Sequence, residues 1–222
     1  MDPTGFTGLV RETIHWPIAQ DADYFTSATS GGAQGAFSIA TSAVGDSVFL
    51  SAEAAKPLYY GRRPQATMTD ASGTTLRVTV RITGKRFGRP VVQDIACVTS
   101  GTAVSGTRVI DEVTSIKIIS MTANAGSDEL VVGLDSEWLG LRQPIKSKND
   151  INMVYKVSTV TPDTAGPKTK SDITAAMVNV VDSAIDFKAL YSAVIAVTHT
   201  YLVEYFSAGG PASMLRVGKR LG

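Results

Sequence analysis

The chain has little of what enzymes and metal-binding proteins depend on. It contains one cysteine, Cys97, and two histidines in 222 residues. A single cysteine excludes an intrachain disulfide and a zinc site built from several cysteines, and we expect Cys97 to be a small buried hydrophobe. The patterns H-x-H, HExxH, G-x-S-x-G and G-x-x-x-x-G-K-[ST] are all missing. Metal-dependent hydrolysis, acyl transfer and nucleotide chemistry therefore lack sequence support, and we predict a non-enzymatic protein without catalytic residues, metal or cofactor.

Charge is sparse and evenly balanced. Lys and Arg number 21, Asp and Glu number 20, and charged residues make up 18% of the chain. This balance offers no electrostatic attraction to nucleic acid or to an anionic membrane. No stretch reaches the roughly 18 apolar residues of a membrane span, and the N-terminus lacks the features of a signal peptide. We expect a soluble product of a cytoplasm, with neither nucleic acid nor membrane as partner.

Alternation of apolar and polar residues is the main pattern that is present. From Leu76 to Ile82, every second residue is apolar and the residues between are Arg or Thr, which is the signature of a half-buried strand. Residues 84–88, Gly-Lys-Arg-Phe-Gly, predict a five-residue connection whose two glycines are able to take positive φ. Residues 90–98 form the returning strand, so we predict an antiparallel hairpin.

Turn signals recur along residues 36–145 without a helical period between them, a pattern typical of β-sandwiches and barrels. We predict an all-β, antiparallel β-sandwich, Ig-like or jelly-roll-like. Its organisation is an extended N-terminal arm (1–35), the main sandwich (36–145), further strands that complete or extend it (146–207) and a C-terminal tail (208–222). Residues 172–190 fit an amphipathic helix or a hairpin, and their β-branched residues favour the hairpin.

The arm, the tail and one aromatic–arginine stretch are the predicted contacts with other molecules. The arm is rich in Gly, Ser and Thr and carries isolated aromatics, and a tyrosine pair precedes an arginine pair at 59–63. Arginine suits contacts with carboxylate-rich surfaces. The predicted partner-binding residues are Trp16, Tyr24, Phe25, Tyr59, Tyr60, Arg62, Arg63, Leu215 and Arg216.

Three further groups leave alternatives open. Asp128, Asp135 and Glu137 cluster near a loop and would hold calcium if they converge, but they lack an EF-hand spacing and are more often solvated. A carbohydrate-binding module is a second alternative, because exposed aromatics stack on sugars; its platform would combine Trp16, Trp138, Tyr59 and Tyr60. His15 and His199 are expected to be packing or surface residues rather than ligands.

A set of strand and turn phrases resembles a β-sandwich module that recurs in virion proteins of tailed bacteriophages. The matching phrases, within roughly residues 65–145, are Ile82-Thr83-Gly84, Phe87-Gly88, Gly101-Thr102-Ala103-Val104, Gly106-Thr107, Val113-Thr114-Ser115-Ile116, Val132-Gly133 and Leu139-Gly140-Leu141. The chain departs from the pattern at Arg86 and Arg89, where polar or acidic residues are commoner.

The resemblance implies a structural virion protein. We expect a capsid decoration or cement protein on the capsid surface, a homotrimer that bridges subunits of the major capsid protein. The alternative within the virion is a neck or tail connector or a tail-tube component.

Overall fold

The computed structural model describes residues 8–15, 17, 21–73, 75–122, 124–158, 166–192, 195 and 199–208, without the side chains of His15, Val157 and Ser158. The all-β prediction is confirmed, since strands account for 47% and helices for 6% of the described residues, with antiparallel sheets and sandwich-like packing. Among the described residues, no helix has the length and apolar character needed to cross a bilayer.

The chain divides into two compact units, which we call the central unit (Ala19–Leu139) and the terminal unit (Met1–Ile18 with Gly140–Gly222). Strand β8 (Glu129–Gly140) carries the chain from the first into the second. The boundary lies at Leu139, not at the predicted residue 145, and the N-terminal residues belong with the C-terminal ones.

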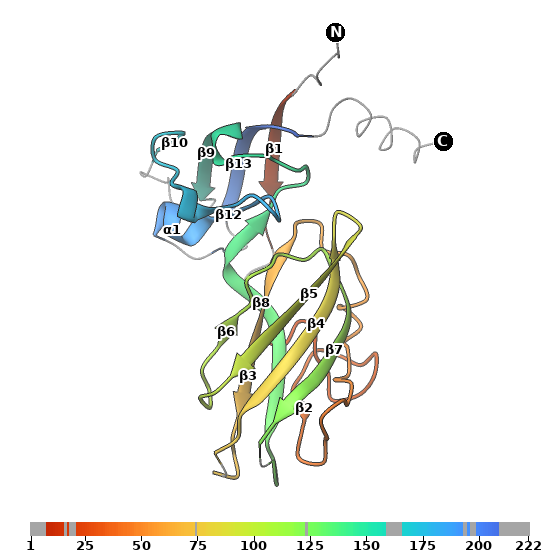
Figure 1. Ribbon diagram of the computed structural model, residues 1–222. Coiled ribbons are helices and arrows are strands. Elements are labelled where there is room, and N and C mark those ends of the chain that lie inside the picture. Colours follow the sequence, from red (N-terminus) through yellow and green to blue (C-terminus); the bar gives the residue numbers. More distant parts are fainter. Residues whose placement is uncertain are drawn as a thin grey trace, which may run out of the picture. The chain divides into compact units, whose positions relative to one another are not determined.

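Two sheets build the central unit (Figure 1). One has the order β5-β4-β7, from β4 (Val78–Arg86), β5 (Arg89–Cys97) and β7 (Glu112–Met121). In the other, β3 (Arg62–Thr69) pairs with β8 and with β6 (Val104–Ser105), and β2 (Phe37–Ser38) pairs with β8. Inward side chains of both sheets form one buried hydrophobic cluster that includes Val80, Ile82, Ile116, Met68 and Val132. Sheets that bury one face in this way show the alternation read from the sequence.

The predicted hairpin is confirmed, but its turn is tighter than expected. Arg86 pairs with Arg89, so only Phe87 and Gly88 form the turn, with φ of 52° and 74°. Positive φ at both positions matches the twist of the flanking strands. Gly84 is inside β4 and does not turn the chain; a Cβ there would overlap the carbonyl oxygen of Glu112.

The predicted N-terminal arm is wrong for residues 21–35. Tyr24 and Phe25 are 7% and 1% exposed and belong to the central hydrophobic cluster. The N–H of Phe25 donates to the carbonyl of Val132 at 2.9 Å, and the N–H of Leu134 donates to that of Asp21 at 2.7 Å. Other backbone groups of the segment pair with residues 49–51, such as the N–H of Ser27 with the carbonyl of Phe49. The segment is therefore part of the central unit's fold.

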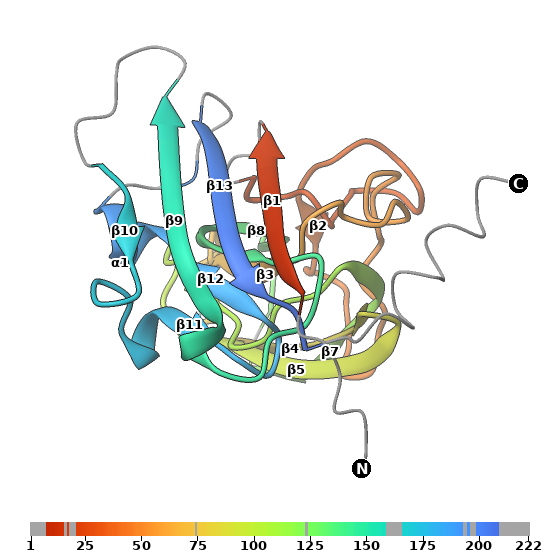
Figure 2. The same cartoon turned by 90° about the horizontal axis from the view of Figure 1, so that it is seen from above.

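Four antiparallel strands form the sheet of the terminal unit, in the order β1-β13-β9-β10 (Figure 2). They are β1 (Leu9–His15), β9 (Ile151–Ser158), β10 (Lys168–Thr169) and β13 (His199–Phe206). Short elements complete the unit: 3-10 helices η1 (Lys148–Asp150) and η2 (Ala175–Met177), strands β11 (Val178–Asn179) and β12 (Ala184–Asp186), and helix α1 (Phe187–Tyr191).

Strand β1 is a second correction to the predicted arm, because it pairs along its length with β13. A buried hydrogen bond reinforces the pairing: the Tyr205 hydroxyl donates to Glu12 at 2.6 Å, and the N–H of Arg142 donates to the same carboxylate. On the outer face, Arg11 forms a salt bridge with Glu204. These contacts tie the two ends of the described chain together.

The hairpin preferred for residues 172–190 is confirmed. Val178 pairs with Ile185, and the turn between them is closed by a hydrogen bond of 2.9 Å from the Asn179 amide to Asp182. The segment also contains the short 3-10 helix η2 before the hairpin, and its α-helix begins only at Phe187, where Asp186 caps the start by accepting from the N–H of Ala189. The β-branched residues therefore decided the structure of this segment.

Candidate interaction surface

Of the six predicted partner-binding residues that the structure describes, Tyr59 is the one left largely exposed. Its side chain is 66% exposed and meets Tyr60, which is half-buried, edge to face with ring centroids 4.7 Å apart. Tyr24 and Phe25 are core residues instead. Trp16, Leu215 and Arg216, together with residues 209–222 of the predicted tail, lie outside the described residues.

The arginine pair is not a surface pair, which corrects another prediction. Arg62 is 2% exposed, and its Nη2 donates to the backbone carbonyl of Asp135. The Arg63 guanidinium stacks over the indole of Trp138, 3.8 Å from the ring centroid. Trp138 is itself 6% exposed, so the described aromatics do not assemble the predicted sugar-stacking platform with Tyr59 and Tyr60.

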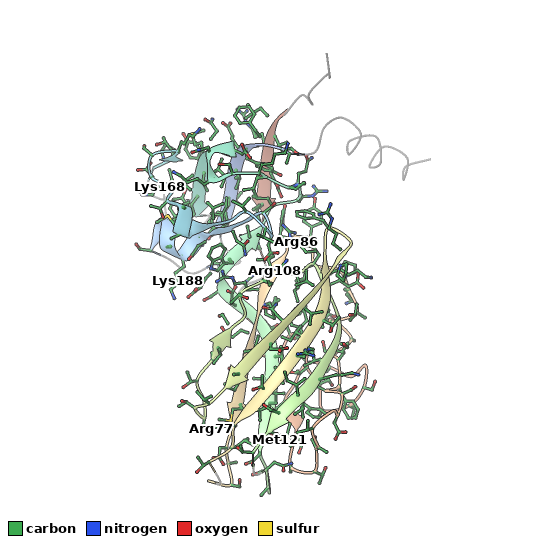
Figure 3. The ribbon with its side chains drawn as sticks, viewed as in Figure 1. Arg77, Arg86, Arg108, Met121, Lys168 and Lys188 are labelled. Atoms are coloured by element: carbon green, nitrogen blue, oxygen red, sulfur yellow. The ribbon has the colours of Figure 1, made fainter. Side chains whose placement is uncertain are left out.

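The tip of the β4–β5 hairpin carries a contact that the sequence did not reveal. Asp111 Oδ1 lies 2.5 Å from Arg86 Nη1, and Asp111 Oδ2 accepts from the N–H of Phe87 at 2.8 Å. The Arg86 guanidinium in turn lies over the Phe87 ring, 3.8 Å from its centroid. One carboxylate thus holds the tip, which is labelled by Arg86 in Figure 3.

The loop before β3 contacts the same Arg86–Asp111 pair. The N–H of Leu58 donates to the carbonyl of Asp111 at 2.6 Å. A Cβ on Gly61 would lie 2.8 Å from both Arg86 Nη1 and Asp111 Oδ1, so only glycine lets this loop approach so closely. The loop that carries Tyr59 and Tyr60 and the turn that carries Phe87 therefore both contact the Arg86–Asp111 pair. We call these three aromatic residues the aromatic surface; Phe87 is 37% exposed.

The chemistry of the aromatic surface suits contact with another protein. Tyrosine and phenylalanine bury much area at a small entropic cost, and aromatic residues are enriched in interface hot spots. Arg86 and Asp111 bond to each other, and Asp111 also accepts from the N–H of Phe87, so the pair orients the ring at the hairpin tip. In the sequence, this contact is signalled by the arginine next to the Phe-Gly turn. The partner of that arginine, Asp111, is 25 positions away in the chain.

The three acids weighed for calcium do not form a metal site. No group of three or more His, Cys, Asp or Glu side chains in the described part of the chain is placed to bind a metal ion. The expectation that these acids are solvated is wrong for Asp128 and Asp135, which are buried. The N–H of Ala125 and the Ser72 side chain donate to Asp128 and hold its pKa below the usual value.

Cys97 and His199 have structural surroundings. Cys97 is 1% exposed, as predicted, and burial raises the pKa of its thiol to about 11, so it stays protonated and unreactive at neutral pH. His199 Nδ1 lies 3.1 Å from the Tyr201 hydroxyl on the same strand.

A second surface feature is the end of the β1–β13 pair. Leu9 pairs with Phe206, and their side chains are 53% and 38% exposed. The backbone pairing continues outward, where the N–H of Ser207 donates to the carbonyl of Gly8 at 3.3 Å. The two terminal segments of the chain therefore start from the same end of one strand pair.

No family model, curated protein or solved structure matches this chain. The resemblance to phage virion modules thus rests on its sequence phrases. Several of them fall at strand ends and turns, such as Phe87-Gly88 at the hairpin tip and Leu139-Gly140 at the end of β8.

Proposed function

We propose that the protein is a non-enzymatic structural component of a tailed-phage virion, a capsid decoration or cement protein that acts as a homotrimer and bridges subunits of the major capsid protein. The observation that carries the proposal is the pairing of Leu9 with Phe206. It brings the starting points of two terminal segments together, at a place where exposed apolar side chains are available for contact.

The two terminal segments start close together, and we call their combined binding to neighbouring subunits the terminal grip. Once the first binds a neighbouring subunit, the second is held close to its own site, so its binding becomes effectively intramolecular. Each additional 1.4 kcal/mol of binding free energy lowers the dissociation constant about tenfold. The work of such a protein is mechanical, because added contact area across subunit boundaries opposes opening of the shell.

The sheet of the terminal unit is the support to which both terminal segments are attached. Hydrogen bonds between β1 and β13, including the Tyr205–Glu12 contact of 2.6 Å, anchor the N-terminal strand to the C-terminal one. A pull on either terminal segment is therefore transmitted to the same sheet.

Deletion variants of the full chain test the proposal. Residues 1–7 and 209–222 are removed separately and together, which leaves β1 and the core residues near Phe25 in place. We expect each single deletion to weaken retention on phage heads and the double deletion to abolish it, with unchanged thermal unfolding. Retention equal to that of the full chain in the double deletion would refute the terminal grip.

Cryo-electron microscopy of intact particles locates the protein independently. Density at many local threefold positions of the shell is the expected result. A few copies in a ring at one vertex would contradict decoration and would support the alternative role in the neck or tail.

A further inference from the structure

The three-stranded sheet of the central unit has one edge that the chain covers and one that it leaves open. Its order is β5-β4-β7 (Figure 1), so β7 and β5 are the two edges. Residues 45–48 lie along β7, where the N–H of Gly45 donates to the carbonyl of Ile118 at 2.7 Å and the N–H of Val48 to that of Ile116 at 2.9 Å. No segment in the described part of the chain pairs with the outer edge of β5. Strand β6 contacts β5 but pairs with β3.

The backbone groups along the open edge belong to the even-numbered residues of β5. On β4, the carbonyl of Thr83 accepts from the Thr114 hydroxyl at 3.1 Å, so the odd-numbered residues of β4 direct their backbone groups toward β7. The even-numbered residues of β4 therefore bond to β5, and their partners there are odd-numbered. Because these directions alternate along an antiparallel strand, the N–H and C=O groups that point outward are those of Val92, Asp94 and Ala96.

These outward groups have no hydrogen-bond partner among the described residues. The strand also lacks the features that usually protect an edge, which are shortness, bulges and lysines. It runs for nine residues and pairs with β4 without a break in register. Val92 is 53% exposed and Val98, just beyond the strand, is 59% exposed. Between Pro90 and Val98 the one charge is that of Asp94, and Arg81 pairs with both of its carboxylate oxygens at 2.8 Å.

We propose that a second copy of this chain occupies the edge, and that the two β5 strands pair antiparallel about a twofold axis at Ile95. Val92 then lies opposite Val98 of the second copy, and Asp94 lies opposite Ala96 of the second copy. Their outward backbone groups make these hydrogen-bonded pairs, each of which exchanges both of its N–H···O=C bonds. The three-stranded sheets of the two copies become one continuous sheet, and main-chain bonds supply the affinity.

The side chains select this register over its neighbours. Opposed valines form a β-branched cross-strand pair, and Asp94 opposite Ala96 avoids a like-charge contact. An axis at Asp94 would place the two carboxylates opposite each other, and would place Pro90, which has no N–H, opposite Val98. An axis at Ala96 would separate the valines. The edge is therefore complementary to itself under a twofold rotation, which is the property of an isologous contact between identical chains.

This contact goes beyond the proposed virion role. An isologous contact closes with two copies, whereas the proposed trimer needs a different, threefold contact. The pairing of β5 also uses neither of the terminal segments that form the terminal grip. The two proposals therefore fail or succeed separately.

Sedimentation of the purified full chain tests the pairing. We expect a particle of twice the mass of one chain, which is 23.4 kDa, and a return to the mass of one chain in Val98→Lys, because this change places a charge against each opposed valine. The matched control is Val44→Lys. Val44 is also 59% exposed but precedes the segment that covers β7, so this variant should stay dimeric.

Other masses decide against the pairing. A dimer that persists in Val98→Lys would use another surface and would refute the proposal, as would a full chain that is monomeric. A trimer whose mass Val98→Lys does not change would refute it as well, and would leave the proposed virion role intact.

Cysteine cross-linking measures the register. A disulfide requires Cα atoms about 4.4–6.8 Å apart, and a hydrogen-bonded antiparallel pair holds them about 5.5 Å apart. We expect Val92→Cys and Val98→Cys proteins to cross-link when they are mixed, and neither to cross-link alone. Asp94→Cys alone should not cross-link, since a bond there would place the axis at Asp94 and contradict the proposed one. A mixture without cross-links would refute the pairing.

Discussion

Asp111 holds Arg86 at 2.5 Å across the tip of the central hairpin, and the Arg86 side chain is 5% exposed while that of Asp111 is 23% exposed. The pair differs from the other salt bridges of the central unit in its burial, and the same carboxylate accepts the N–H of Phe87. Its role is to fix the turn and the loop that carries Tyr59.

Replacing Asp111 should therefore destabilise the hairpin tip. In Asp111→Ala the buried guanidinium keeps its charge without its partner, and we expect a loss of about 2 kcal/mol in the free energy of unfolding, less than for a fully buried pair because water reaches the carboxylate. Chemical denaturation measures it. The control is Asp94→Ala, which breaks the exposed Arg81–Asp94 pair and should leave the midpoint unchanged; equal effects of the two would contradict a special role for Asp111.

Asp135 should make the central unit more stable in weak acid than at neutral pH. Its folded pKa of about 6 lies above the ordinary 3.8, so the folded state binds the proton more tightly. Stability from this group is complete below about pH 4 and is lost as pH rises through 6. The difference is about 3 kcal/mol at most.

The asparagine variant separates this contribution from other titrations. Asp135→Asn should be more stable than the unaltered protein at pH 7, and the advantage should shrink toward pH 4. Thermal unfolding at both pH values measures it. A constant difference between the two proteins across this range would argue against a raised pKa.

Loss of the Tyr205 hydroxyl should loosen β1. In Tyr205→Phe, the buried Glu12 carboxylate loses a hydrogen bond of 2.6 Å, and we expect a cost of about 2 kcal/mol, as for hydrogen bonds to charged groups. Hydrogen exchange of the β1 amides should quicken. Tyr155→Phe on the neighbouring strand β9 is the matched control, since Tyr155 is partly exposed; comparable exchange in both variants would count against the buried contact.

Gly133→Ala should detach the segment around Phe25 from β8. A Cβ at Gly133 would overlap the carbonyl oxygen of Asp21, which is backbone and has little room to move. We expect a loss of about 3 kcal/mol, at the upper end for overpacking. Gly35→Ala places its Cβ in open space and should be near neutral. Limited proteolysis should cut residues 21–35 faster only in the first variant; equal cleavage would restore the arm prediction.

Local patterns predicted the elements whose partners are close in sequence. The β4–β5 hairpin and the β11–β12 hairpin follow from alternation, β-branched residues and turn residues. The burial of Cys97 follows from its place on a strand with one inward face. In each case, the side-chain period and the turn chemistry are readable within a window of about 20 residues.

The sequence by itself determined the all-β class, the central hairpin and the lack of catalytic motifs, because these depend on composition and on short-range periodicity. Only the tertiary structure decided that Phe25 is a core residue, that Arg62 is buried, and that Asp111 grips Arg86. Each of these depends on a partner 25 or more positions away in the chain, the separation of Arg86 and Asp111 being 25. A charged or aromatic side chain looks the same in sequence whether such a partner buries it or water surrounds it.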